Sequence, residues 1–129
     1  MKKCEYRMIH IIGCVIMDER LYNISEFAIE GEEAVKTVFY TTDSTSGSVW
    51  CVKPGQEVAC HTHNNSDDIW ICIQGEGVFY PELGDEIPIK KGQVAVTPKG
   101  LCHGATNTGD EDFIFVSIVA PVPADYNPL

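Results

Sequence analysis

The sequence predicts an all-β protein, built as a β-sandwich or a β-barrel. Short apolar and β-branched runs recur at close intervals between positions 37 and 120, separated by turn-forming segments such as NNSD, LGDE and PKG. Many short strands with even turn spacing are typical of these two architectures. The predicted strands are 37–42, 47–53, 57–63, 68–74, 76–81, 86–90, 93–97, 102–107 and 113–120. A chain of 129 residues is long enough to bury one hydrophobic core, so a single domain is expected.

The segment that precedes these strands is predicted to be an arm. Residues 8–17 (MIHIIGCVIM) form an apolar run of only ten residues, whereas a membrane span needs about 20. A strand buried on both faces, or an arm packed on a partner subunit, fits this run better. The polar stretch 18–36 is expected to wrap around the domain, with one helical turn at 32–36.

Two predicted strands are apolar on both faces, at 69–73 (IWICI) and 113–119 (FIFVSIV). A sheet that faces water on one side normally alternates apolar and polar residues. We therefore expect an outer face to be covered by the arm or by a second subunit, and we predict a homodimer. The C-terminal tail, PVPADYNPL, contains three prolines and is expected to run irregularly over the surface.

The composition excludes several classes of partner. The chain has 19 acidic and 9 basic residues and a net charge of −10, which argues against binding to nucleic acid or to anionic membrane surfaces. Its six cysteines show no CxxC spacing, and polar residues interrupt the N-terminal apolar run where a secretory signal would be continuous. We therefore expect reduced thiols and a cytoplasmic location.

His61 and His63 are candidate metal ligands in the predicted strand 57–63. Alternate side chains of a strand share one face, and the rise per residue places these two Cα atoms roughly 6.6 Å apart. Two imidazoles at this spacing can bind one ion through metal–nitrogen bonds of about 2.0–2.1 Å. The competing interpretation is a solvated histidine pair without a metal.

A carboxylate follows this pair after a turn. The segment NNSD reverses the chain, so that Asp68 can point back toward the ion, whereas Asp67 lies in the turn and has the wrong parity. An acid that orients a ligand from outside the coordination shell is the alternative role for Asp68. Side chains that share its inward face, together with one tryptophan of the preceding strand pair, are candidates for the substrate pocket: Trp50, Trp70, Cys72 and Gln74.

Two segments of the chain resemble the two sequence motifs of the cupin superfamily, in its small single-domain form. The first motif reads G, five residues, HxH, three or four residues, E, six residues, G. It is matched by Gly55, His61, His63, Asp68 and Gly75, with Asp68 in the place of Glu. The second motif reads G, five residues, PxG, two residues, H, three residues, N. It is matched without a gap by Gly92, Pro98, Gly100, His103 and Asn107.

The resemblance covers about residues 36–120 and implies both a fold and a site. The implied fold is the double-stranded β-helix, or jelly-roll barrel, with 36–129 as barrel and short C-terminal tail and 1–35 as the extra N-terminal strand or arm. The implied ligands are His61, His63, Asp68 and His103, which would hold one divalent transition metal. Fe, Mn, Ni, Co and Zn all suit such ligands. Because Asp is shorter than Glu, direct coordination by Asp68 is left open.

Resemblance to cupins implies chemistry on a small molecule, such as dioxygenation, decarboxylation or isomerisation. Polyanionic substrates usually need a convergent set of cations, whereas both arginines, Arg7 and Arg20, precede the predicted strands. A small, neutral organic ligand is therefore expected. We favour a metalloenzyme of the oxidoreductase, isomerase or lyase class, since a sensor would be expected to carry an output segment. The alternative is a non-catalytic cupin that senses or stores a metal or small ligand.

Overall fold

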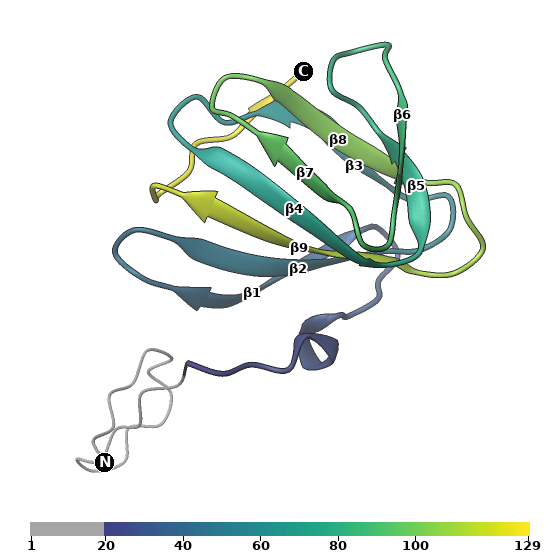
Figure 1. Cartoon of the computed structure of the whole chain (residues 1–129), viewed down its shortest axis with the longest axis horizontal. Coiled ribbons are helices and arrows are strands. Elements are labelled where there is room, and N and C mark those ends of the chain that lie inside the picture. The colour runs from purple at the N-terminus through teal and green to yellow at the C-terminus, as the bar shows by residue number, and fades with distance from the viewer. Residues whose placement is uncertain (1–19) are drawn as a thin grey trace.

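A computed structural model describes residues 20–129 and shows two antiparallel five-stranded sheets, as the sequence predicts (Figure 1). One sheet has the strand order β1-β2-β9-β4-β7, and the other has the order β10-β3-β8-β5-β6. The strands are β1 (Val35–Thr41), β2 (Ser46–Val52), β3 (Glu57–Thr62), β4 (Asp67–Gln74), β5 (Glu76–Phe79), β6 (Ile87–Lys90), β7 (Val94–Thr97), β8 (Cys102–Asn107), β9 (Phe113–Ala120) and β10 (Asn127–Pro128). The fold is that of a double-stranded β-helix.

The core lies between the two sheets and is built by strand alternation. In β4, Asp68, Trp70 and Cys72 are buried, while Ile69 is half-buried and Ile71 is 38% exposed. The predicted parity of this strand is therefore correct from Asp68 to Cys72. The core cluster takes residues from both sheets: Val52, Val58, Trp70, Cys72, Ile89, Ala105, Phe113 and Phe115.

Two motif glycines have backbone conformations that disfavour a side chain. Gly75 directly follows β4 with φ +83°, and a Cβ there would lie 2.7 Å from the carbonyl oxygen of Asp112. Gly100 has φ +87°, and its N–H donates to the carbonyl of His63 at 2.7 Å. A side chain is strained at such angles. The second contact ties the β7–β8 turn to the end of β3, which sets where His103 lies relative to His63.

The prediction of a helical turn at 32–36 is wrong. The chain instead forms a short 3-10 helix at Ile24–Phe27, and Val35 already pairs with Cys51 in the β1–β2 ladder. The ring of Phe27 lies 5.7 Å from the ring of Phe39, so aromatic packing against β1 accompanies this earlier turn. The charged side chains of 32–36 gave a local helical signal that strand pairing overrides.

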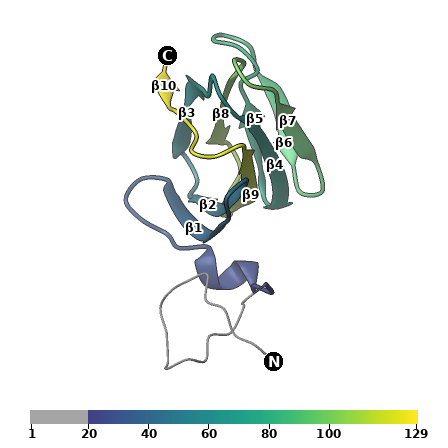
Figure 2. The same ribbon diagram turned by 90° about the vertical axis from the view of Figure 1, so that its left-hand side faces the viewer.

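The C-terminal tail is more ordered than its prolines suggested. Asn127–Pro128 forms β10 and pairs with β3, as Figure 2 shows beside the chain end. Proline is accepted at this edge of the sheet, where its missing N–H removes no ladder bond. The strand predicted within residues 8–17 lies outside the described residues and stays a prediction.

Candidate metal centre

Three strands bring the four predicted ligands together. His61 belongs to β3 and His103 to β8, and the two residues are direct partners in the antiparallel ladder. His63 follows the last residue of β3, and Asp68 is the second residue of β4 in the opposite sheet. All four side chains are buried, from 9% exposed for His63 to 1% for His103.

The four side chains converge on one point between the sheets. The atoms that could bind a metal all lie within 4.8 Å of one another. The ring centroid of His61 is 4.1 Å from that of His103, and the Asp68 Oδ2 lies 2.9 Å from His103 Nε2 and 3.4 Å from His63 Nε2. Bonds of about 2.0–2.1 Å place neighbouring ligand atoms about 3 Å apart around one ion. A small contraction of this cluster would meet that requirement.

Hydrogen bonds outside the cluster fix which atoms face its centre. The Nδ1 of His61 donates to the carbonyl of Ala59 at 2.8 Å, and the Nδ1 of His63 donates to the carbonyl of Asp125 at 2.5 Å. Carbonyls only accept, so in its neutral form each ring carries its lone pair on Nε2, the atom that can bind a metal. The Ser117 hydroxyl donates to Asp68 Oδ1 at 2.7 Å, which leaves Oδ2 toward the histidines.

The electrostatics of the cluster keep His61 neutral and Asp68 anionic, which are the forms of these side chains that bind a metal. Burial lowers the pKa of His61 to about 4, so this ring is neutral at pH 7. Hydrogen bonding to Asp68 raises the pKa of His63, against the opposing effect of burial. Burial acts to raise the pKa of Asp68, but hydrogen bonds from His103, His63 and Ser117 outweigh it and hold that pKa well below its usual value. The donor set is one anionic carboxylate oxygen and three imidazoles, and these donors suit a divalent transition metal.

A cavity of about 350 Å³ opens onto this cluster. Trp50 and Trp70 contribute to its wall, whereas the two other predicted pocket residues do not. Cys72 is buried in the core cluster, and the side-chain amide of Gln74 donates to the carbonyl of Asp112 at 3.0 Å. Cys72 has the predicted inward parity, but it lies too far along β4 from the ligands to reach the cavity. A register shift between Cys72 and Gln74 interrupts the alternation, so the parity predicted for Gln74 is wrong.

Several residues at the site were missed by sequence reasoning. Lys36 and Tyr126 line the cavity, and Ser117 both lines it and holds Asp68. A signal for Ser117 was present, because it is the one polar residue of the run FIFVSIV. Nothing local in the sequence marked Asp125, whose contact with His63 depends on the path of the tail across the barrel.

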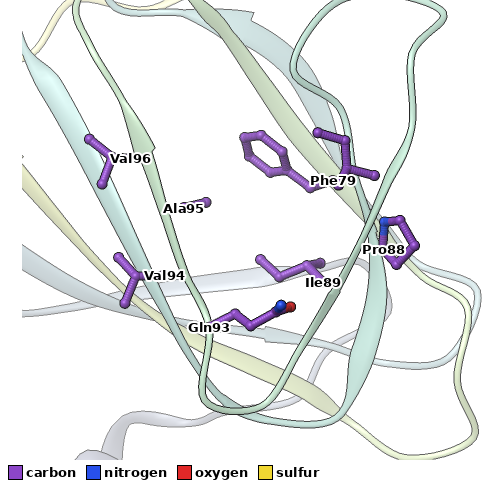
Figure 3. Close-up of a pocket in the computed structure, with 8 residues that line it drawn as sticks. Phe79, Pro88, Ile89, Gln93, Val94, Ala95 and Val96 are labelled. Carbon is purple, nitrogen blue, oxygen red and sulfur yellow. The ribbon is translucent and has the colours of Figure 1, made fainter.

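A second hollow of about 360 Å³ lies between β6 and β7, at the free edges of the two sheets (Figure 3). Its wall is almost entirely apolar, formed by Phe79, Ile87, Pro88, Ile89, Gln93, Val94, Ala95 and Val96. Figure 3 shows Phe79, Ala95 and Ile89 facing the space between the two strands. We call this hollow the β6–β7 groove.

Comparison with known proteins agrees with this combination of a two-sheet barrel and a histidine–carboxylate cluster. Residues 48–119 match the cupin domain family, and the chain belongs to that family. A structure from Klebsiella pneumoniae, an uncharacterized conserved protein with a double-stranded β-helix domain, superposes with a TM-score of 0.83. It is 35% identical, and the match covers 86% of this chain and 97% of that one.

Two curated relatives match over shorter segments. An oxalate-binding protein from Thermotoga maritima is 38% identical over 66 residues, which is 51% of this chain and 54% of that protein. A gentisate 1,2-dioxygenase from Ralstonia is 26% identical over 66 residues, 51% of this chain and 18% of the enzyme. The chain thus spans about half, or less, of the length of these two relatives. Within residues 20–129 no helix is long and apolar enough to cross a membrane.

Proposed function

We propose that this cupin is a metal-dependent enzyme that acts on a small, neutral organic molecule. The observation that carries the proposal is the convergence of three histidines and Asp68 on one point beside the cavity, with the Nδ1 atoms of His61 and His63 already engaged by carbonyls. His61, His63, Asp68 and His103 would hold one divalent ion. Such an ion acts as a Lewis acid toward a substrate oxygen and keeps open coordination positions for it. This supports dioxygenase-like or isomerase-like chemistry.

The charges of the cavity support a neutral substrate. Lys36 and the divalent ion are balanced by three carboxylates of the lining, Glu33, Glu57 and Asp68, so a dianion would meet no net positive charge. Trp50 and Trp70 add apolar walls that suit a carbon skeleton. The similarity to an oxalate-binding protein makes oxalate the informative competitor: under this proposal it binds more weakly than a neutral ligand of the same size.

The experiment has two steps. The native metal is first identified by mass spectrometry or anomalous scattering. The loaded protein is then incubated with a panel of small neutral molecules and organic acids, under air and under argon, beside His61→Ala. Metal-dependent turnover that His61→Ala abolishes supports the enzyme, and a requirement for air assigns a dioxygenase. Stoichiometric ligand binding without turnover supports the second candidate, a non-catalytic binding cupin, which the similarity to a binding protein favours.

We further propose that the protein is a homodimer in the cytoplasm. The outer face of β4 and β7 carries exposed apolar side chains, with Ile71 at 38%, Val94 at 54% and Val96 at 64% exposure. Ile71 and Val94 are ladder partners, so these residues form one patch beside the β6–β7 groove. A second copy of the chain, with its apolar segment 8–17, would cover it. The free thiols of Cys51, Cys60, Cys72 and Cys102 suit a reducing compartment.

A further inference from the structure

The C-terminal tail crosses the turn that carries the candidate ligands. We call residues 121–129 the strap. It is attached at both ends: the Ser66 hydroxyl donates to the carbonyl of Pro121 at 2.6 Å, and the N–H of Leu129 donates to the carbonyl of Cys60 at 3.1 Å. Between these points β10 pairs with β3, opposite Thr62 and His61 (Figure 2). The strap is therefore bound to the same short segment that presents two of the four ligands.

Asp125 is the centre of these contacts. Its backbone carbonyl accepts from the Nδ1 of His63, and its carboxylate accepts from the backbone N–H groups of Asn64 at 2.9 Å and Asn65 at 3.0 Å. The side-chain amide of Asn127 donates to the same carboxylate at 2.7 Å. One residue thus binds the candidate ligand and the two residues that follow it, which fixes the His63 ring relative to the turn.

The neighbouring residue of the strap closes the cavity wall. The ring of Tyr126 lies 4.9 Å from the ring of His61, at an interplanar angle of 32°, and lines the cavity together with Ala124. The strap therefore contacts both histidines of the first motif, His63 through a hydrogen bond and His61 through a ring. Neither contact is needed to complete the hydrophobic core, whose members come from the barrel strands.

We propose that Asp125 is a positioning residue of the metal centre, and that docking of the strap and binding of the metal stabilise each other. The inference rests on the proposed metal site. A ligating histidine is generally oriented by a partner on its other nitrogen, and loss of that partner typically costs 10- to 100-fold in metal affinity. Here the partner is a backbone carbonyl, so the side chain of Asp125 acts indirectly, by holding its own peptide against the turn. Coupling of this kind is reciprocal: whatever the strap adds to metal affinity, the metal adds to docking of the strap.

In the first test, the metal-free full-length protein is titrated with Co²⁺. Binding is measured by calorimetry and by the visible spectrum of the bound ion. Asp125→Ala removes the clamp and should weaken Co²⁺ binding by about 10- to 100-fold and alter the spectrum. Asp125→Asn keeps one of the two side-chain oxygens, so its affinity for Co²⁺ should lie between that of the wild type and that of Asp125→Ala. Asp110→Ala, which removes an exposed aspartate from the β8–β9 loop, is the control with the same change in charge and should match the wild type.

The second test uses the wild-type protein and measures amide hydrogen exchange with and without Co²⁺. Exchange in residues 124–129 should slow when the metal binds, whereas exchange in β5 and β6 should not change. A merely structural tail would not respond to the metal. If wild type binds Co²⁺ and Asp125→Ala binds it equally well, or if the strap is not protected, the inference is wrong while the metal site stands. If wild type binds no Co²⁺, both the metal site and the inference fail.

Discussion

The two hollows of this barrel are similar in size but opposite in chemistry. The cavity beside the four candidate ligands measures about 350 Å³ and the β6–β7 groove about 360 Å³. In the first, buried polar side chains are held by hydrogen bonds, such as the one from Ser117 to Asp68 at 2.7 Å. In the second, apolar side chains remain open to solvent, as Val96 does at 64% exposure.

Each hollow departs from the usual pattern of a globular protein, in which charged groups are exposed and apolar groups are buried. A buried carboxylate is costly unless it is paired, so a carboxylate kept with three histidines indicates a ligand set. An exposed apolar patch is likewise unfavourable in a monomer and indicates a partner. The first hollow is thus interpreted as a small-molecule site, and the second as a contact surface between protein copies. The two interpretations can be tested separately, because the hollows share no lining residue.

The largest effect is expected from loss of a ligand. His61→Ala, His63→Ala or His103→Ala should each lower metal affinity by more than about 100-fold, since loss of an orienting partner alone typically costs 10- to 100-fold. Val96→Ser, at the rim of the β6–β7 groove, is the matched control and should leave metal affinity unchanged. Affinity for Co²⁺ is measured by calorimetry. Histidine variants that bind Co²⁺ as tightly as the wild type would contradict a metal site in the first hollow.

The second prediction concerns the groove and the exposed patch. Deletion of residues 1–17 should change the oligomeric state or cause aggregation, because the apolar segment 8–17 would no longer cover the patch of a second copy. Light scattering coupled to size-exclusion chromatography measures the mass directly. A well-behaved monomer both before and after the deletion would show that the exposed valines do not mark an interface.

The third prediction is a pH dependence of metal affinity, caused by the histidines of the first hollow. The pKa of His63 is raised above 6.5 by hydrogen bonding to Asp68, and a metal must displace the proton that this ring binds. Metal affinity should therefore begin to fall once the pH drops below this raised pKa, and the fall should be about tenfold per pH unit because one proton is displaced per ion. His61, with a pKa lowered to about 4 by burial, should add a second proton only near that pH. Calorimetry between pH 5 and 8 tests this, and a flat profile would contradict it.

Much of the barrel could be predicted because its signals are local. Alternation from Asp68 to Cys72 correctly gave the inward face of β4, and the NNSD turn correctly returned Asp68 toward the histidines. Asp125 could not be found in this way, because its contact with His63 joins residues 62 positions apart. For Cys72 the parity was correct but insufficient, because it gives the face of a strand and not the position along the barrel axis at which the core ends and the cavity begins. For Gln74 the alternation itself is interrupted by a register shift after Cys72.

Coordination distances in the metal-loaded protein are the most direct test of the proposal that three histidines and Asp68 hold one ion. A crystal structure at full metal occupancy should place one nitrogen of each of His61, His63 and His103 at about 2.0–2.1 Å from the ion, and a carboxylate oxygen of Asp68 at about 2.0–2.2 Å. The shorter side chain of Asp68 is expected to reach the ion, since its Oδ2 already lies 2.9 Å from His103 Nε2. An ion bound by fewer than three histidines, or an Asp68 oxygen more than about 3 Å away with a water between them, would contradict the proposed ligand set.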